Sequence, residues 1–244
     1  STSALPIPGG GIRITGRKWH ITNAPIASVV LVLAKDDAGR LVLAIVDRDL
    51  PGVAVGAPLA PAGARTSPVA EIDFKDVEIP SENVFRPNRD GQNMLRKVLT
   101  AEKILGAYPA IGMMDRVIQE SMTFVSKRKV SGRPLSRQQH VQHRLTEMQI
   151  SLETVRGFAG STLRRFSLGE DVTLEAAALK LQAMRMGVET GISAIQTCGS
   201  YGLQEESRLP MAMLDGLSGT IGGGTEEAQR IIVFSEMTRR RRPL

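Results

Sequence analysis

The spacing of apolar residues changes from a strand pattern to a helix pattern about a third of the way along the chain. Two aliphatic runs, Val29 to Ala34 and Leu41 to Val46, flank a hydrophilic segment with Gly39 near its end, which predicts an antiparallel hairpin. Further strand positions, which indicate a strand pair or one bulged strand, are Ile72, Phe74, Val77 and Ile79. The polar, Pro- and Gly-rich segment from Pro51 to Pro68 before them predicts a loop.

From about residue 91 onward, apolar residues recur every three or four positions. One stripe consists of Val141, Leu145, Met148 and Leu152, and another begins with Leu174, Ala177, Ala178, Leu181 and Met184. Long helices joined by short connections, here at about 130–136 and 166–173, form antiparallel bundles. The pattern therefore predicts an α+β chain, with an antiparallel β module over residues 1–90 and an up-down, four-helix-bundle-like α domain over residues 91–244.

Glu102 interrupts a further apolar stripe with a carboxylate. The stripe consists of Leu95, Val98, Leu99, Glu102, Leu105, Gly106 and Pro109, which share one face of a helix. We therefore expect the Glu102 carboxylate to point inward, where an unpaired charge costs several kcal/mol unless it is protonated or finds a partner. Proton abstraction in a dry pocket would explain its position, and a protonated or salt-bridged core glutamate is the structural alternative.

Composition narrows the class of protein without identifying it. The 244 residues are 42% hydrophobic, and no apolar run approaches the roughly 18 residues that span a bilayer, so we expect no membrane insertion. The single Cys198 excludes an internal disulfide and a CxxC site, which fits an intracellular, cytoplasmic location. His140 and His143 have a spacing that could converge on a metal, but no matching carboxylate or Cys pattern lies nearby, so we predict no metal site.

The net charge of +6 does not indicate a nucleic-acid partner. Four arginines cluster at the tail, at positions 239–242, and aromatic residues make up only 4% of the chain. We interpret this cluster as a solvated tail and predict no nucleic-acid partner. A moderate basic excess would equally suit a small ligand that carries phosphate.

Three segments have unusual residue choices. Gly16 to Ala24 contains the only Trp, Trp19, which could simply be an aromatic side chain that covers the core at a strand end. Gln196 to Gly202 is a small-residue break at the end of a long helix, and a helix C-cap explains it. Ile221 to Glu227 places glycines before a helix that begins near Thr225; either it is a flexible connector, or its backbone N–H groups bind a diphosphate, a carbonyl oxygen or an electron-rich ring. It lacks the Lys-Ser/Thr of a P-loop.

Taken together, these segments resemble the acyl-CoA dehydrogenase family over essentially the whole chain. The matching segments, in order, are Gly16–Ala24, Glu71–Pro80, Arg128–Gly132 with Pro134 and Gln139, Gln196–Gly202, and Asp215 with Ile221–Gln229. The resemblance implies that the β module is part of the family's middle domain and that residues 91–244 form its C-terminal helical domain. It also implies FAD as cofactor, an acyl thioester of CoA or of a carrier protein as substrate, an electron-transfer flavoprotein as electron acceptor, and a homodimer or homotetramer.

In this family a carboxylate removes the α proton of the thioester while flavin N5 accepts the β hydride. Most members carry the base directly before the Gly-Thr of the last motif, where this chain has Gly223. A minority, which resemble the isovaleryl- and long-chain-type enzymes, carry it in an L-x-x-E-R pattern on the helix after the β domain. Leu99 to Lys103 is similar to that pattern, with Lys103 for Arg, so the resemblance implies that Glu102 is the base.

The resemblance also implies a set of cofactor and substrate contacts. Thr22 would hydrogen-bond the flavin near N5, with His20 at the position of the Trp that usually packs beside it. Thr225 and Glu227 would contact FAD from the last loop, and the residues expected to reach the FAD of a neighbouring subunit are Arg128, Gln139, Gln196 and Gly199. The N–H of Gly223 would polarise the thioester carbonyl, and Lys103 would lie near the pantetheine or its phosphates.

The chain departs from the family pattern in several places. Ser131 replaces the Phe of R-x-x-F-G and Leu214 replaces the Arg before Asp215. The family's N-terminal helical domain and its T-E-P-x-x-G-S-D segment are absent from this sequence, so we expect the chain alone to be a poor dehydrogenase. We favour a truncated or partly ordered enzyme over a natural partial subunit that completes its site in a hetero-oligomer. A flavin-dependent monooxygenase on the same scaffold and a non-catalytic structural subunit are the rival functions.

Overall fold

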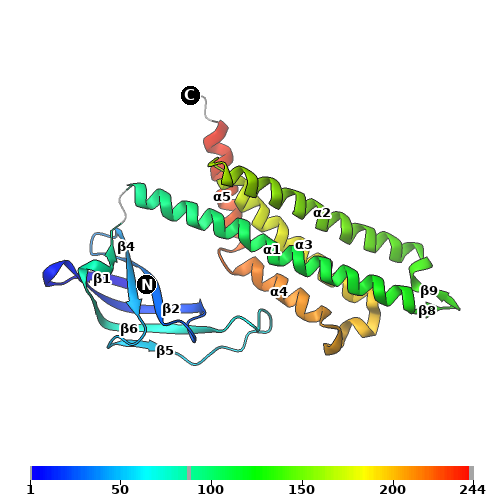
Figure 1. Cartoon of the computed structure of the whole chain (residues 1–244), viewed down its shortest axis with the longest axis horizontal. Helices are drawn as coiled ribbons and strands as arrows, with labels where there is room; N and C mark the ends of the chain where they lie inside the picture. Colours follow the sequence, from blue (N-terminus) through cyan, green and yellow to red (C-terminus); the bar gives the residue numbers. More distant parts are fainter. Residues whose placement is uncertain (1, 87–88, 242–244) are drawn as a thin grey trace. The chain divides into compact units, whose positions relative to one another are not determined.

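The computed structural model describes residues 2–86 and 89–241, and these form two compact units (Figure 1). The first unit comprises Ser1–Pro61 and Arg65–Arg96, and the second comprises Ala62–Ala64 and the chain from Lys97 onward. The sequence placed a boundary near residue 90. Arg242, the last of the four clustered arginines, lies outside the described residues.

The first unit contains a seven-stranded sheet within the described residues, in the order β5-β6-β2-β1-β3-β4-β7. The strands are β1 (Thr2–Pro6), β2 (Ile12–Thr22), β3 (Val29–Lys35), β4 (Leu41–Asp47), β5 (Val53–Val55), β6 (Val69–Ile79) and β7 (Val84–Phe85). The predicted hairpin is confirmed as β3 and β4, paired antiparallel from Val29–Asp47 to Lys35–Leu41. Gly39 in its turn has φ +75°, a conformation that glycine adopts without steric cost.

Two details of the sheet refine the sequence prediction. β6 is one bulged strand, because its pairing with β2 shifts register between Ile14 and Gly16, where β6 carries the extra residue. At a second shift, between Lys18 and Ile21, the extra residue lies on β2. The sheet was predicted to be antiparallel, and it is so except where β1 lies beside β3 and the two run parallel. Short 3₁₀ turns link the chain at Pro8–Gly10, Ser81–Asn83, Leu135–Arg137, Gly199–Leu203 and Glu205–Ser207.

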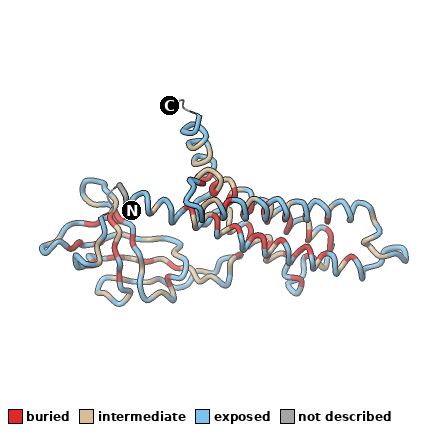
Figure 2. The backbone as a smooth tube through the Cα atoms, turned by 45° about the horizontal axis from the view of Figure 1, so that its top comes forward, coloured by how far each residue is buried: buried red, intermediate tan, exposed pale blue. Residues whose placement is uncertain are grey.

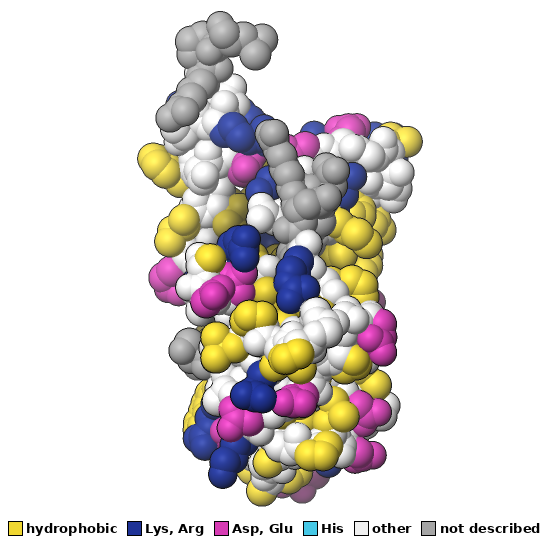
Figure 3. Space-filling view, turned by 90° about the vertical axis from the view of Figure 1, so that its left-hand side faces the viewer, with side chains coloured by type: hydrophobic (Ala, Val, Ile, Leu, Met, Phe, Trp, Pro, Cys, Tyr) yellow, Lys and Arg dark blue, Asp and Glu magenta, His cyan; other side chains and the backbone are white. Residues whose placement is uncertain are grey.

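The sheet curls around a core built from alternate residues of its strands. On β3, Val32 and Ala34 are buried, whereas Leu31 on the other face is 61% exposed. The ring of Trp19 is also exposed, at 55% for the residue, so its interpretation as an aromatic that covers the core is wrong. Figure 3 shows one face of the molecule, on which hydrophobic and charged side chains are interspersed at the surface.

The second unit is a bundle of long helices. They are α1 (Arg89–Lys127), α2 (Gln139–Ser167), α3 (Thr173–Cys198), α4 (Leu209–Ile221) and α5 (Glu226–Arg241). α1, α2 and α3 lie lengthwise beside one another, and α5 crosses them (Figure 1). The predicted fold class, an antiparallel β module followed by an up-down helical bundle, is confirmed. No helix in residues 2–86 or 89–241 is both long and apolar enough to cross a membrane.

A small hairpin joins α1 to α2. Its strands are β8 (Lys129–Val130) and β9 (Arg133–Pro134), and the two turn residues, Ser131 and Gly132, have φ +50° and +77°. Two successive positive φ values are the signature of a type I′ hairpin turn. This turn accommodates the serine that departs from the family pattern.

The bundle core confirms one predicted stripe and corrects another. Val141, Leu145, Met148 and Leu152 of α2 are all buried, as the spacing predicts. Buried positions recur along the long helices of the bundle (Figure 2). On α3, Ala177 and Met184 are buried as predicted, whereas Leu174, Ala178 and Leu181 are only partly buried. The buried residues in this first half of α3, which include a lysine, are Ala176, Ala177, Leu179, Lys180, Ala183 and Met184.

The predicted inward stripe of α1 is wrong. Val98, Leu99 and Leu105 are 56%, 43% and 59% exposed, and Glu102 is exposed as well. The buried face of α1 instead runs through Ile104, Ala107, Ile111, Met114 and Ile118. α1 is apolar on two faces, and the spacing of apolar residues does not tell which of them the bundle covers.

The interpretation of the arginine cluster at positions 239–242 as a solvated tail is also corrected. Arg239 and Arg240 belong to α5. Arg239 forms an ion pair with Asp171, just before α3, and Arg240 forms one with Glu175, in the first turn of α3. Arg240 holds both carboxylate oxygens of Glu175, at 2.8 and 2.9 Å. The cluster is therefore not simply a solvated tail: two of its arginines attach α5 to the bundle.

Candidate functional site

A glycine loop between α4 and α5 is held by a buried lysine. In this loop, which we define as Gly222–Gly224, Gly223 and Gly224 have φ +62° and +94°. Lys180 on α3 is only 6% exposed, and its Nζ donates hydrogen bonds to the carbonyl oxygens of Gly222 and, at 2.5 Å, of Gly224. Two successive positive φ values make a tight turn here, and both carbonyls reach one ammonium group.

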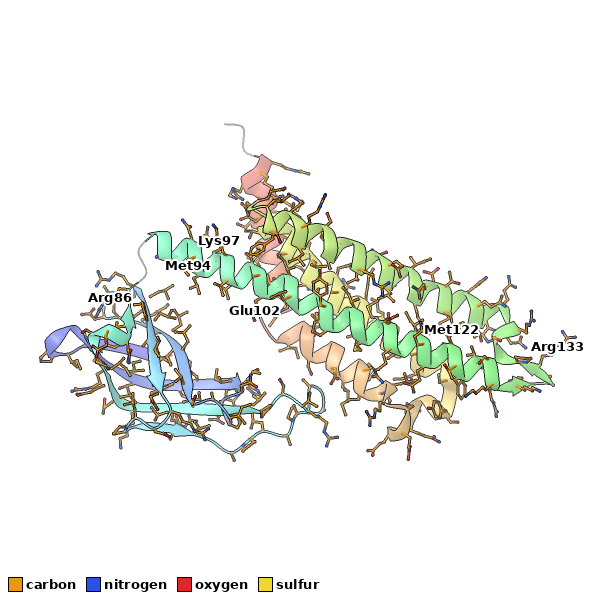
Figure 4. All side chains as sticks on the ribbon, viewed as in Figure 1. Arg86, Met94, Lys97, Glu102, Met122 and Arg133 are labelled. Atoms are coloured by element: carbon orange, nitrogen blue, oxygen red, sulfur yellow. The ribbon has the colours of Figure 1, made fainter. Side chains whose placement is uncertain are left out.

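Glu102 lies directly beside this loop. A Cβ built on Gly223 would stand 3.3 Å from Oε1 of Glu102 and 3.4 Å from Nζ of Lys180. Glu102 lies on α1 (Figure 4), whereas Lys180 lies on α3 and Gly223 lies in the loop between α4 and α5. The structure thus brings together the two positions that the sequence analysis linked, Glu102 and Gly223, although the carboxylate is exposed rather than buried in a dry pocket.

The charges around Glu102 are partly desolvated. Burial lowers the pKa of Lys180 below its ordinary value, an effect that the nearby Glu102 carboxylate opposes and the positive charge of Lys103 reinforces. Burial also lowers the pKa of Lys103, again opposed by Glu102. Nζ of Lys103 donates to the carbonyl of Leu99 at 3.1 Å. The site therefore combines one accessible carboxylate with two ammonium groups whose solvation is reduced.

Gln229 supports the loop from the other side. It is 2% exposed, and its Nε2 donates to the Gly224 carbonyl at 3.0 Å. Its Oε1 is buried without a hydrogen-bond partner within the described part of the chain. Sequence reasoning noted Gln229 only as the end of a motif and missed Lys180. The signal that could have found the lysine is its place among the buried alanines of α3.

Thr225 and Glu227 stand at the start of α5. The backbone N–H of Ala228 donates to Oγ1 of Thr225 at 3.4 Å, the contact of a helix cap. The pKa of Glu227 lies below its ordinary value because its own backbone N–H and then the Thr225 hydroxyl hydrogen-bond the carboxylate. Both residues therefore have a structural role at the start of α5. The sequence analysis expects them, in addition, to contact FAD.

A second candidate site is a cleft of about 390 Å³ at the far end of the bundle from the glycine loop. Three of the residues predicted to reach FAD, Arg128, Gln196 and Gly199, line it together. The fourth, Gln139, is the first residue of α2 and precedes the lining residue His140. Gly199 has φ +59° at the point where α3 ends, which agrees with the helix-end prediction for this segment.

The lining of this cleft also contains residues that the sequence analysis did not assign. They are Phe124, Leu135, His140, Val141, Arg144, Thr197, Cys198, Ser200 and Tyr201. The rings of Phe124 and Tyr201 stack at 5.1 Å with an interplanar angle of 10°. Two guanidinium groups, an imidazole and a side-chain amide beside aromatic rings suit a ligand with phosphate groups and a planar ring. The donor set fits one end of a dinucleotide.

Thr22 and His20 lie in the first unit, whereas the other predicted site residues lie in the second. Thr22 ends β2 and is exposed. His20 has φ +52°, and its ring meets that of Trp19 edge-on at 5.6 Å. Among residues 2–86 and 89–241, no group of three or more His, Cys, Asp or Glu side chains could hold a metal ion.

Comparison with known proteins gives matches along nearly the whole chain. The family model "Acyl-CoA dehydrogenase, middle domain" matches residues 1–77, and "Acyl-CoA dehydrogenase, C-terminal domain" matches residues 89–238. The mitochondrial isovaleryl-CoA dehydrogenase of Oryza sativa subsp. japonica is 30% identical over 232 residues, which are 93% of this chain and 57% of that enzyme.

Solved structures agree with these matches. Butyryl-CoA dehydrogenase from Megasphaera elsdenii superposes with a TM-score of 0.93 at 26% identity, covering 98% of this chain and 63% of that one. The FAD complex of PigA gives 0.92, also at 26% identity, with the same coverage. The chain thus spans less than two thirds of the length of these relatives. With both family models matched in order and the fold shared, the chain belongs to the acyl-CoA dehydrogenase family.

Proposed function

We propose that this chain supplies the catalytic base of an FAD-dependent acyl-CoA dehydrogenase, which forms an α,β double bond in an acyl thioester. The observation that carries the proposal is the position of Glu102, whose Oε1 lies 3.3 Å from where a Gly223 side chain would begin. The carboxylate therefore occupies the space next to the loop position at which most family members carry their base. Glu102 is therefore in reach of a substrate that contacts the loop.

In this proposal Glu102 takes the α proton from the thioester. The N–H of Gly223 donates to the thioester carbonyl, which acidifies the α carbon. Lys103, partly desolvated and one residue from the base, contacts the pantetheine arm or its phosphates. The acyl group is carried by CoA or by a carrier protein.

We assign the cofactor contacts to two sets of residues. Thr22, His20, Thr225 and Glu227 contact the flavin end of one FAD, and Arg128, Gln139, Gln196 and Gly199 the diphosphate and adenine end of the FAD of a neighbouring copy. Arg144 and His140 add positive charge and a ring to the same cleft. When bound, FAD supplies the acceptor for the β hydride. This arrangement requires at least two copies of the chain, and we propose a homodimer or homotetramer. We also propose an electron-transfer flavoprotein as redox partner and a cytoplasmic location.

Replacing the base tests the proposal. In the FAD-loaded enzyme, Glu102→Gln is expected to retain FAD and to slow reduction of the flavin by acyl thioester by about 10²–10⁴-fold, the usual range for loss of a general base. Bleaching of the flavin absorbance in a stopped-flow instrument measures this rate. Glu153→Gln, on the exposed side of α2, is the matched control and should reduce at the wild-type rate. Unchanged bleaching in Glu102→Gln would remove Glu102 from the role of base.

A further inference from the structure

Lys180 is a charge that the proposed reaction does not use. The side chain of Lys180 lies on the buried face of α3, and this burial lowers the pKa of its ammonium group. An ammonium group in such a place costs free energy unless acceptors compensate for its lost hydration. The acceptors are the carbonyl oxygens of Gly222 and Gly224, which flank the residue opposite Glu102.

These contacts decide the shape of the glycine loop. Gly223 and Gly224 both have positive φ, and glycine is the residue with the largest freedom to leave such a conformation. Without an external tie, the loop would sample other conformations. Lys180 ties it on both sides of Gly223, and Gln229 ties the Gly224 carbonyl a second time at 3.0 Å.

We propose that Lys180 is a positioning residue, which clamps the carbonyls of Gly222 and Gly224 so that the backbone of Gly223 stays opposite the Glu102 carboxylate. The inference rests on the proposed function for its kinetic consequence, since a fixed Gly223 N–H aligns the thioester with the base. It does not rest on that function for the conformation of the loop. Lys180 acts through the loop and does not itself exchange a proton with the substrate.

The first measurement needs neither FAD nor a reaction. Amide hydrogen exchange over residues 219–229 is compared between the wild type and Lys180→Met, which keeps the length of the stem and removes the charge. We expect exchange in this segment to accelerate at least tenfold while exchange in α2 is unchanged. Lys180→Arg, which keeps the charge and the N–H donors, is expected to restore at least half of the lost protection on a logarithmic scale. Equal exchange in the wild type and Lys180→Met overturns the inference.

The second measurement separates positioning from mere support of the fold. In the FAD-loaded enzyme, Lys180→Met should lower the maximal rate of flavin reduction at least tenfold, while the Kd for FAD changes less than twofold. Leu152→Ala, a core truncation in α2, serves as a control that lowers stability without touching the loop. A Lys180→Met enzyme with a loosened loop and a wild-type maximal rate shows that the lysine is only structural.

If Lys180→Met does not fold, Lys180→Gln, a shorter side chain without the charge, takes its place in both measurements. Faster exchange in the loop together with a lower maximal rate supports the inference, and a wild-type value of either quantity overturns it. Failure of the proposed function is seen separately, as unchanged flavin reduction in Glu102→Gln.

Discussion

Gly223 and Glu102 are close neighbours: a Cβ on Gly223 would stand 3.3 Å from Oε1 of Glu102. A longer side chain at residue 223 would therefore meet the carboxylate on α1. The glycine loop and this part of α1 lie more than a hundred residues apart in sequence. This single relationship leads to the first two predictions.

Gly223→Ala should destabilise the helical unit by about 1–2 kcal/mol, because an L-residue is strained at φ +62° and the added carbon approaches Glu102 and Lys180. Thermal or denaturant unfolding measures the change. Gly222→Ala is the matched control, since Gly222 has φ −64° and its Cβ would meet only the Ser218 carbonyl oxygen, at an ordinary 3.5 Å. Equal effects at the two glycines would contradict this account.

Moving the carboxylate from residue 102 to residue 223 should restore part of the flavin reduction that is lost with Glu102. Gly223→Glu in a Glu102→Gly background returns a carboxylate to the same region and avoids two like charges side by side. We expect flavin reduction at least tenfold faster than in Glu102→Gly alone, measured by stopped flow at saturating thioester. The strained backbone at residue 223 keeps the rate below that of the wild type. A double variant as slow as Glu102→Gly would show that the two positions do not present a carboxylate to the same atom.

The cleft beside Arg128 should bind FAD through charge. Arg128→Gln and Arg144→Gln are each expected to weaken FAD binding about tenfold or more, which corresponds to about 1.5–3 kcal/mol for a hydrogen bond to a charged group. The loss should shrink as salt rises, because ions screen the attraction of an exposed site. Flavin fluorescence titration gives both values. Arg164→Gln, near the other end of α2, should bind FAD normally; an equal loss there would point to a general effect of net charge.

The ion pairs of Glu175 should make the attachment of α5 depend on pH. A hydrogen bond from Arg240 is the largest cause that lowers the pKa of Glu175 to about 2, from an ordinary value of 4.5, and Arg165 adds a further contact. Because the pKa is depressed in the folded state, the stabilisation is complete above about pH 4.5 and is lost as the pH falls toward 2.

Glu175→Gln is therefore expected to cost about 1–2 kcal/mol at pH 7, after allowance for solvent screening, and little at pH 2.5. Unfolding measured at both pH values tests the difference, and amide exchange in α5 localises it. The exposed Glu153, paired with Arg156 within one helix, is the control, and Glu153→Gln should change stability by less than about 0.5 kcal/mol at either pH. A pH-independent effect at residue 175 would contradict the ion-pair explanation.

The apolar residues of the α1 stripe should matter little to the stability of this chain. Leu105→Ser is expected to change the free energy of unfolding by less than about 0.5 kcal/mol, since Leu105 is 59% exposed. Leu152→Ala, at a fully buried position of α2, should cost about 2–5 kcal/mol. Urea denaturation of both variants gives the comparison. A large loss in Leu105→Ser would mean that the stripe is buried in solution, for instance by self-association, which sedimentation would detect.

Local patterns were enough for the elements of the fold. The hairpin of β3 and β4 follows from two aliphatic runs and one turn, and the buried stripe of α2 from apolar residues at helical spacing. These signals are short-range, because the side chains that pack together in one element recur with the period of that element. The glycine-rich break before α5 was also visible in the sequence.

Which apolar face of α1 is covered could not be read from the chain. Leu105 and Ile104 are neighbours of similar hydrophobicity, yet one is exposed and the other buried. Only the packing of α2 and α3 makes this choice. For the same reason the inward orientation predicted for Glu102 was wrong. Lys180 was missed because a lysine is normally expected at the surface.

The sequence by itself determined that a β module precedes a helical bundle. Its resemblance to the family pointed to residues 102 and 223 as the two positions at which members carry a base. Tertiary structure alone decided that these two residues adjoin one another, that Lys180 holds the loop between them, and that Arg128 and Gln196 line one cleft. The physical reason is that periodicity fixes the face of a residue on its own element. Contacts between elements depend on how whole helices pack, and residues far apart in the sequence determine that packing as much as neighbouring residues do.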